Sequence, residues 1–215
     1  MNGDFKMKEN ISRKEREFLT RRADILSAAE KVFAARGFYG STMDEIAKRA
    51  EFGTGSLYKY FRGKKDLYFS LIDEKVAEIT RLVRAELDKD LPPLERIASA
   101  LDLQLAFIQR NRDFFKIYIS ERNRFEWTIK DDLGKGVHEK FMTYIDWLEG
   151  VMRQGIEEGR LKEMDPRDMA HGFVGIVNSF VFEWLMSPRA YSLVSKGPTI
   201  MNIFFGGVRG SKERR

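Results

Sequence analysis

The stretch ILSAAEKVFAARGFYGSTMDEIAKRAEFGTGSLYKYFRGKKDL, residues 25–67, decides the fold. Its apolar residues recur three and four positions apart, which is the period of a helix with one buried face. The first stripe runs from Ile25 to Phe33 and is followed by Gly37, a residue suited to a helix C-cap. Helical periods continue along the rest of the chain, with no alternating strand signal. The sequence therefore predicts an all-α protein of about nine helices.

Two short helices follow in the same stretch. Thr42 and Glu45 have the spacing of a capping box, in which each side chain accepts a hydrogen bond from the other residue's amide, so a helix should run from there to Ala50. A second short helix opens at Gly53 and closes at Gly63. Three helices, the last two short and joined by about three residues, form a helix-turn-helix, whose second short helix fits the DNA major groove.

The second short helix has one face for the protein and one for DNA. Leu57 and Phe61 lie four positions apart and should bury against the preceding helix. Tyrosine hydroxyls can donate to phosphate while their rings pack on the scaffold, lysine can reach guanine or phosphate, and glycine permits close approach. The side chains left for DNA are Thr54, Gly55, Ser56, Tyr58, Lys59 and Tyr60. Core tyrosines and a solvated lysine are the alternatives.

Positive charge is concentrated in the same part of the chain. Residues 1–65 hold 15 Lys and Arg against 9 Asp and Glu, whereas residues 66–215 hold 23 against 24. A basic segment beside a neutral one is typical of a polyanion-binding module joined to a second domain, although a solvated charged surface has the same composition. We expect a DNA-binding domain over 1–65 and a second domain over 66–215. An N-terminal arm would include Arg13, Lys14, Arg16, Arg21 and Arg22.

Residue usage argues against an enzyme, a metal site and a cofactor. The chain has no cysteine, which excludes disulfides, thiolate zinc sites and a cysteine nucleophile. Its two histidines, His138 and His171, have no metal-ligand spacing, and the sequence VHEKF lacks the second histidine of a zinc-protease helix. The carboxylates are scattered along helix faces. We therefore expect no catalytic residue, no metal and no cofactor.

The sequence predicts neither secretion nor a membrane partner. Residues 1–20 are too charged for a signal peptide. The longest apolar stretch, Phe173 to Met186, is shorter than the roughly 18 residues of a membrane span, and it contains Asn178 and Glu183. We expect a cytoplasmic protein.

The run from Ile25 to Leu67 closely resembles the DNA-binding domain of TetR-family regulators. The residues that match the family at fixed spacing are Phe33, Gly37, Thr42, Ile46, Ala47, Gly55, Leu57, Tyr58, Tyr60, Phe61, Lys64 and Leu67. The resemblance implies that Thr42 caps the first short helix and touches phosphate. It also implies that Tyr58, Tyr60 and Lys64 hold the DNA backbone, and that residues 54–59 read bases.

Two residues depart from the family pattern at the turn between the short helices. Glu51 stands where the family often has glycine, so a left-handed backbone there would carry a strain of about 1 kcal/mol. Its charge would also oppose nearby phosphate. Gly53 stands where a serine often caps the recognition helix, which weakens the cap by a few tenths of a kcal/mol.

The remaining two thirds should form a helical effector-binding and dimerisation domain, as the resemblance implies. Helical periods, prolines and glycines predict a loop over 130–136 and helices over 64–87, 94–109, 113–122, 137–158, 166–186 and 198–205. Aromatic residues are plentiful, and an apolar pocket with few polar groups would suit a hydrophobic or planar small molecule. The residues predicted to line it are Tyr118, Trp127, Tyr144, Trp147 and Phe173.

The family forms its dimer with the last two helices, and two features of this chain fit such a seam. The stretch from Gly172 to Phe180 is apolar nearly all round, so it must be buried on several sides, either within the monomer or against a second copy. Small residues there permit close helix approach. The residues predicted for the dimer interface are Gly172, Gly175, Ser179, Ile200 and Phe204.

These features predict a dimeric, sequence-specific DNA-binding transcriptional regulator, a repressor released by a small hydrophobic effector. Two recognition helices about 34 Å apart would read the half-sites of a pseudo-palindromic double-stranded operator. A regulator without small-molecule control, such as an activator or a partner-controlled DNA binder, shares every N-terminal residue discussed. A filled second domain would favour that alternative, and an open apolar cavity would oppose it. An enzyme is the distant alternative.

Overall fold

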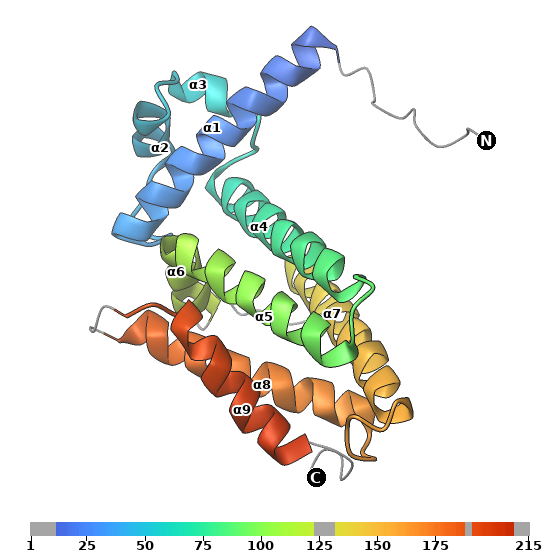
Figure 1. Ribbon diagram of the computed structural model, residues 1–215. Helices are drawn as coiled ribbons and strands as arrows, with labels where there is room; N and C mark the ends of the chain where they lie inside the picture. Colours follow the sequence, from blue (N-terminus) through green and yellow to red (C-terminus); the bar gives the residue numbers. More distant parts are fainter. Residues whose placement is uncertain (1–11, 123–131, 188–190, 209–215) are drawn as a thin grey trace, which may run out of the picture. The chain divides into compact units, whose positions relative to one another are not determined.

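The computed structural model describes residues 12–122, 132–187 and 191–208, and over these residues it contains helices and no strand (Figure 1). The all-α prediction is confirmed. The helices are α1 (Arg13–Arg36), α2 (Met43–Arg49), α3 (Thr54–Leu57), α4 (Lys64–Leu87), α5 (Pro93–Arg110), α6 (Arg112–Arg122), α7 (Asp132–Glu157), α8 (Pro166–Met186), the 3₁₀ helix η1 (Val194–Lys196) and α9 (Gly197–Val208).

The chain divides into two compact units, an N-terminal unit, Met1–Leu71, and a C-terminal unit, Ile72–Arg215. The helix α4 contributes to both units, because its first two turns lie before residue 72. Leu67, Tyr68 and Leu71 on those turns are buried. The functional boundary at residue 65 stays a prediction.

An aromatic cluster holds α4 in the N-terminal unit. The ring of Tyr68 meets Phe33 of α1 edge-on, with ring centres 5.4 Å apart, and lies 5.1 Å from Phe38. Gly37 separates the two phenylalanines at a φ of 69°, and its amide donates to the Phe33 carbonyl oxygen at 2.7 Å. The predicted glycine C-cap is therefore confirmed, and it turns the chain so that both rings reach one core.

The first helix begins earlier than the apolar stripe indicates. It starts at Arg13, and the Ser12 hydroxyl oxygen accepts from the Glu15 amide at 3.2 Å. An ion pair of 2.6 Å between Glu17 and Arg21, one turn apart, supports this exposed part. Residues 13–22 are therefore helical, which corrects the expectation of an arm there; residues 1–11 lie outside the described chain.

The C-terminal unit is built around α5, which contacts α6, α7, α9 and η1, while α8 packs on α6, α7 and α9. Figure 1 shows α8 and α9 as neighbours in orange and red. By length and its mean hydropathy of 1.2, α8 could cross a membrane, yet 44% of that window is buried inside the protein. Its apolar character is thus that of a core helix.

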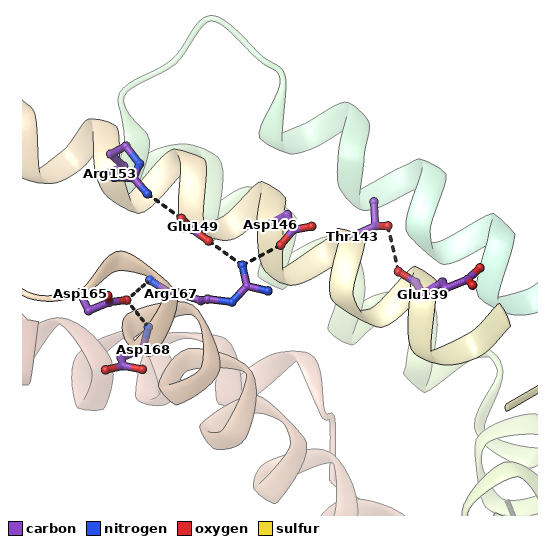
Figure 2. A network of polar contacts seen from close by, with 8 residues as sticks. All are labelled: Glu139, Thr143, Asp146, Glu149, Arg153, Asp165, Arg167 and Asp168. Atoms are coloured by element: carbon purple, nitrogen blue, oxygen red, sulfur yellow. Dashed lines mark hydrogen bonds and ion pairs between the residues drawn. The ribbon is translucent and has the colours of Figure 1, made fainter. Parts of the chain in front are cut away.

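Polar contacts fix the start of α8 against α7 (Figure 2). The Asp165 carboxylate accepts from the amides of Arg167 at 2.8 Å and Asp168 at 3.0 Å, so the predicted cap before Pro166 is confirmed. The Arg167 guanidinium bridges Asp146 and Glu149 of α7, each at 2.9 Å. Those two carboxylates raise the pKa of Arg167, the hydrogen bond to Asp146 most of all.

Two helix boundaries differ from the sequence expectation for one reason. The helix α7 begins at Asp132 and includes positions 132–136 of the predicted loop, with Gly134 and Gly136, while positions 130 and 131 lie outside the described residues. The helix α9 continues through Gly206 to Val208. Glycine inside a helix costs only about 1 kcal/mol relative to alanine, and tertiary packing can offset that cost. The glycines were therefore weaker stop signals than the sequence suggested.

Candidate functional site

The first short helix, α2, is fixed by the capping box that the sequence predicted. The Glu45 amide donates to the Thr42 hydroxyl oxygen at 3.2 Å, and the Thr42 amide donates to the Glu45 carboxylate at 3.0 Å. The other carboxylate oxygen of Glu45 pairs with Arg36 of α1 at 2.5 Å. The exposed Thr42 is thereby held at the N-terminus of α2, where backbone amides favour an anion such as phosphate.

The turn between α2 and α3 has a strained backbone at Glu51. Glu51 has a φ of 60°, and no other described residue except glycine has a positive φ. The Phe52 amide donates to the Ala47 carbonyl oxygen at 2.9 Å, which closes the turn. Gly53 precedes α3 in an extended conformation without a side-chain cap. The sequence left the conformation of this turn open, and the structure shows a left-handed Glu51 and an uncapped start of α3.

Replacing Glu51 by glycine is expected to stabilise the protein by about 1 kcal/mol, because glycine adopts this φ without strain. Thermal unfolding measures the change. Glu51→Gln serves as the control, since it removes the charge and keeps the strain, and it should leave the midpoint nearly unchanged. A glycine variant no more stable than the glutamine variant would contradict the strain at this turn.

The recognition helix is anchored from behind and exposed in front. Leu57 and Phe61 are buried, and the Phe61 amide donates to the Leu57 carbonyl oxygen at 3.0 Å, so the helical turn continues past α3. Tyr58 is 55% exposed. Lys59 and Gly55 are exposed, while Thr54 and Ser56 are half-buried. The polar side of this turn is therefore accessible, as a DNA-reading helix requires.

Tyr60 and Lys64 are held more tightly than their neighbours. The Tyr60 ring stacks on Phe18 of α1 with centres 4.7 Å apart. The Lys64 ammonium donates to the Ser41 carbonyl oxygen at 2.7 Å and lies 4.7 Å from the centre of the Phe38 ring. Lys64 thus ties the start of α4 to the residue before Thr42, a structural role that the sequence did not reveal. Its phosphate contact stays a prediction.

A cavity of about 180 Å³ lies in the C-terminal unit, and we call it the α4–α7 cavity. It is lined by Val76, Ile79, Thr80 and Val83 of α4, Gln104 of α5, Phe114, Phe115 and Tyr118 of α6, and Val137, Lys140, Phe141 and Tyr144 of α7. The Tyr144 hydroxyl donates to Gln104 at 3.1 Å. Burial raises the pKa of Tyr144, so this group stays protonated and a donor.

The structure brings together two of the five residues predicted for a pocket. Tyr118 and Tyr144 line the α4–α7 cavity. Phe173 is instead a core residue, with its ring 5.1 Å from that of Phe204. Trp147 packs against the core under the Arg84 guanidinium, 4.9 Å from the ring centre. Trp127 lies outside the described residues. Sequence reasoning missed the polar lining residues, Thr80, Gln104 and Lys140, because their facing depends on tertiary packing.

The residues predicted for a dimer interface separate into two groups. Gly172, Gly175 and Ser179 lie on the exposed side of α8. Ile200 and Phe204 are 0% and 5% exposed, because they fill the core between α9 and its neighbours, and this corrects the expectation for both. The exposed apolar residues nearby are Phe182 and Met186 of α8, at 53% and 65%, and Ile203 of α9, at 52%. We call Gly172, Gly175, Ser179, Phe182, Met186, Thr199, Asn202, Ile203 and Gly206 the α8–α9 face.

Acidic and histidine side chains form no metal site in the described parts of the chain. There, no group of three or more His, Cys, Asp or Glu side chains is placed to hold an ion.

Two family models match the chain, one after the other. The model described as bacterial regulatory proteins of the tetR family matches residues 25–71, and the model described as a tetracyclin repressor-like C-terminal domain matches residues 90–186. The first covers the C-terminal half of α1, then α2, α3 and the start of α4, and the second covers α5 to α8. Each compact unit therefore contains one of the two matches.

Relatives resemble the chain over most of its length. The fatty acid metabolism regulator protein of Bacillus subtilis is 24% identical over 185 residues, 86% of this chain and 93% of that protein. The transcriptional regulator FadR from Bacillus subtilis, solved with stearoyl-CoA, has a TM-score of 0.71 at 23% identity and covers 87% of this chain and 99% of its own. The ketosteroid regulator KstR2 of Mycobacterium tuberculosis has a TM-score of 0.72 at 22% identity, with coverages of 89% and 96%.

The two matched family models agree with the structure of the unit that each one covers. An accessible recognition turn on a capped helix-turn-helix precedes a helical unit with a cavity, and the relatives are regulators rather than enzymes. The chain therefore belongs to the TetR family of bacterial regulatory proteins, and it is a soluble, DNA-binding transcriptional regulator.

Proposed function

We propose that the protein is a cytoplasmic, dimeric repressor that leaves its operator when a small, mainly apolar effector enters the α4–α7 cavity. The observation that supports this most is the α4–α7 cavity itself, which has apolar walls and a few polar groups, the usual make-up of a small-molecule site. The cavity counts against the alternative of a regulator without small-molecule control.

The helix α4 offers a route from effector to DNA. Four of its residues line the α4–α7 cavity, and its first residue, Lys64, bonds to the residue before Thr42. An effector can shift the protein away from the DNA-binding state only by its differential affinity for the two states. A ligand that contacts α4 can have such a differential affinity, because the first two turns of α4 belong to the N-terminal unit and a shift of α4 would therefore reach that unit.

Apolar side chains dominate the lining and define the class of effector. Ile79, Val83, Phe114 and Phe115 offer dispersion contacts, whereas the Tyr144–Gln104 pair offers one place for a polar group. FadR from Bacillus subtilis was solved with an acyl-CoA, stearoyl-CoA, which shows that this relative takes a long-chain molecule. For the present chain we propose an amphipathic effector with an extended apolar part.

A second copy would pack on the α8–α9 face. Residues 172, 175, 179, 182 and 186 recur at three and four positions along α8 and form one exposed stripe, and Ile203 and Gly206 form another on α9. A two-fold axis would set this face against itself, as most homodimers do. The dimer would hold two recognition helices about 34 Å apart, so we expect a pseudo-palindromic operator.

Narrowing the α4–α7 cavity is expected to separate DNA binding from effector response. In Thr80→Phe the larger side chain would exclude the effector without taking its place, so operator affinity should stay within about twofold while release by the effector is lost. A mobility-shift titration with the region upstream of the protein's own gene, with and without fatty acids and acyl-CoA thioesters, measures both.

Ala77→Phe is the matched control, because Ala77 lies on the exposed side of the same helix. It should keep both activities. If Thr80→Phe released the operator at wild-type effector concentrations, the effector would bind outside the α4–α7 cavity. If the wild type did not bind the operator at low ionic strength, the proposed function as a whole would be wrong.

A further inference from the structure

One cation stands at the edge of the α4–α7 cavity. Lys140 is the single charged residue among the described residues that line it, and no carboxylate lines it. The ammonium of Lys140 forms an ion pair with Asp73 of α4, a residue that does not line the α4–α7 cavity. The ion pair thus joins α4 to α7 and holds the cation beside an apolar space.

Two contacts between α4 and α7 flank the lining residues of α4. Asp73 of α4 pairs with Lys140 of α7, and Arg84 of α4 lies over the Trp147 ring of α7. The lining residues of α4 fall between positions 73 and 84, so the Lys140–Asp73 pair lies at one end of this segment of α4. A ligand with one anionic end and an apolar body would place that end at Lys140 and its body against the apolar lining.

The exposed fractions of Lys140 and Asp73 indicate how readily Lys140 could exchange Asp73 for another anion. The side chain of Lys140 is 30% exposed, while that of Asp73 is 57% exposed. An ion pair with so exposed a carboxylate contributes little, because water solvates Asp73 well when it is released. An anion that enters the α4–α7 cavity meets the same ammonium in a less hydrated place, where the attraction is stronger. Little stability is therefore lost when Lys140 exchanges Asp73 for such an anion.

We propose that Lys140 binds an anionic end of the effector, a carboxylate or a phosphate, in place of Asp73. This inference rests on the proposed function and deepens it, since it makes the effector an apolar molecule with an anionic end. The exchange also frees the carboxylate of Asp73 on α4, the helix shared with the DNA-binding unit.

Calorimetric titration of the full-length protein with three ligands of one chain length tests this. Dodecanoate carries a carboxylate, dodecanoyl-CoA carries phosphates, and 1-dodecanol is uncharged. We expect at least one of the two anions to bind the wild type about tenfold or more tightly than the alcohol, as charge-assisted hydrogen bonds do. The anion that shows this preference identifies the source of the charge.

Two variants and their controls separate charge recognition from structure. Lys140→Met should abolish the preference for the anion and leave alcohol binding unchanged, whereas Lys116→Met, on the exposed side of α6, should behave as wild type. Asp73→Asn should tighten anion binding severalfold without affecting the alcohol. Glu78→Gln, an exposed acid on α4, should change neither.

Equal binding of alcohol and anions by the wild type, or an anion preference that survives in Lys140→Met, would overturn the inference and leave the proposed function standing. Should Lys140→Met fail to fold, unchanged anion binding by Asp73→Asn would overturn it. If no ligand bound and none released the operator, both the inference and the proposed function would fall.

Discussion

Replacing Phe182 by glutamate is expected to convert the dimer into monomers and to lower operator affinity by about 100-fold or more. Phe182 is 53% exposed on the α8–α9 face. A two-fold interface would bring both new carboxylates into the same seam, where each loses water without gaining a cation. Monomers would engage one half-site each and lose the second recognition helix.

Sedimentation velocity measures the oligomeric state, and fluorescence anisotropy with operator DNA measures the affinity. Met164→Glu is the matched control, because Met164 is also an exposed apolar residue, in the connection between α7 and α8. It should remain a dimer with wild-type affinity. If Phe182→Glu remained a dimer and bound its operator with wild-type affinity, the α8–α9 face would not be the dimer interface.

The second large effect is expected at the recognition turn. Lys59→Ala should weaken operator binding by about 1–3 kcal/mol, since Lys59 is exposed beside Tyr58 on the polar side of the turn. The pattern of the loss separates its two chemical roles. A phosphate contact predicts a uniform loss over sequences and a smaller salt dependence, whereas a base contact predicts relaxed specificity at one position.

Lys116→Ala provides the comparison, because it removes an exposed lysine from the C-terminal unit and should leave operator affinity unchanged. Circular dichroism would verify that the Lys59 variant keeps its helices. Wild-type affinity and specificity in Lys59→Ala would mean that the recognition turn meets DNA in another way.

Local chemistry explains why the sequence predicted the N-terminal unit well. The Thr42–Glu45 capping box and the Gly37 cap each depend on residues within a few positions, so their signals are complete in the sequence. The sequence marked Glu51 as a departure from the family pattern but left its backbone conformation open. Contacts between distant residues carry no such signal. Lys64 donates to Ser41, 23 positions earlier, and nothing in the pattern distinguished this role from a phosphate contact.

The C-terminal unit shows the same limit more clearly. Helical periodicity identifies an apolar face but not the partner that covers it, so Ile200 and Phe204 looked suited to a dimer seam although α9 buries both within the unit. Phe173 and Trp147 likewise pack in or against the core, whereas Tyr118 and Tyr144 reach the α4–α7 cavity. The α4–α7 cavity is formed by residues of four helices, α4 to α7, so the periodicity of any single helix could not predict it.

Operator affinity as a function of salt concentration tests the central claim most directly. For a dimer that makes about six to ten phosphate contacts, affinity for a pseudo-palindrome from its own upstream region should fall by about 10³ to 10⁵ between 50 and 200 mM salt, and scrambled DNA should bind far more weakly. Tyr58→Ala combined with Lys59→Ala should remove that preference. The absence of salt-sensitive binding at low ionic strength, or a double variant indistinguishable from wild type, would contradict recognition of DNA through this turn.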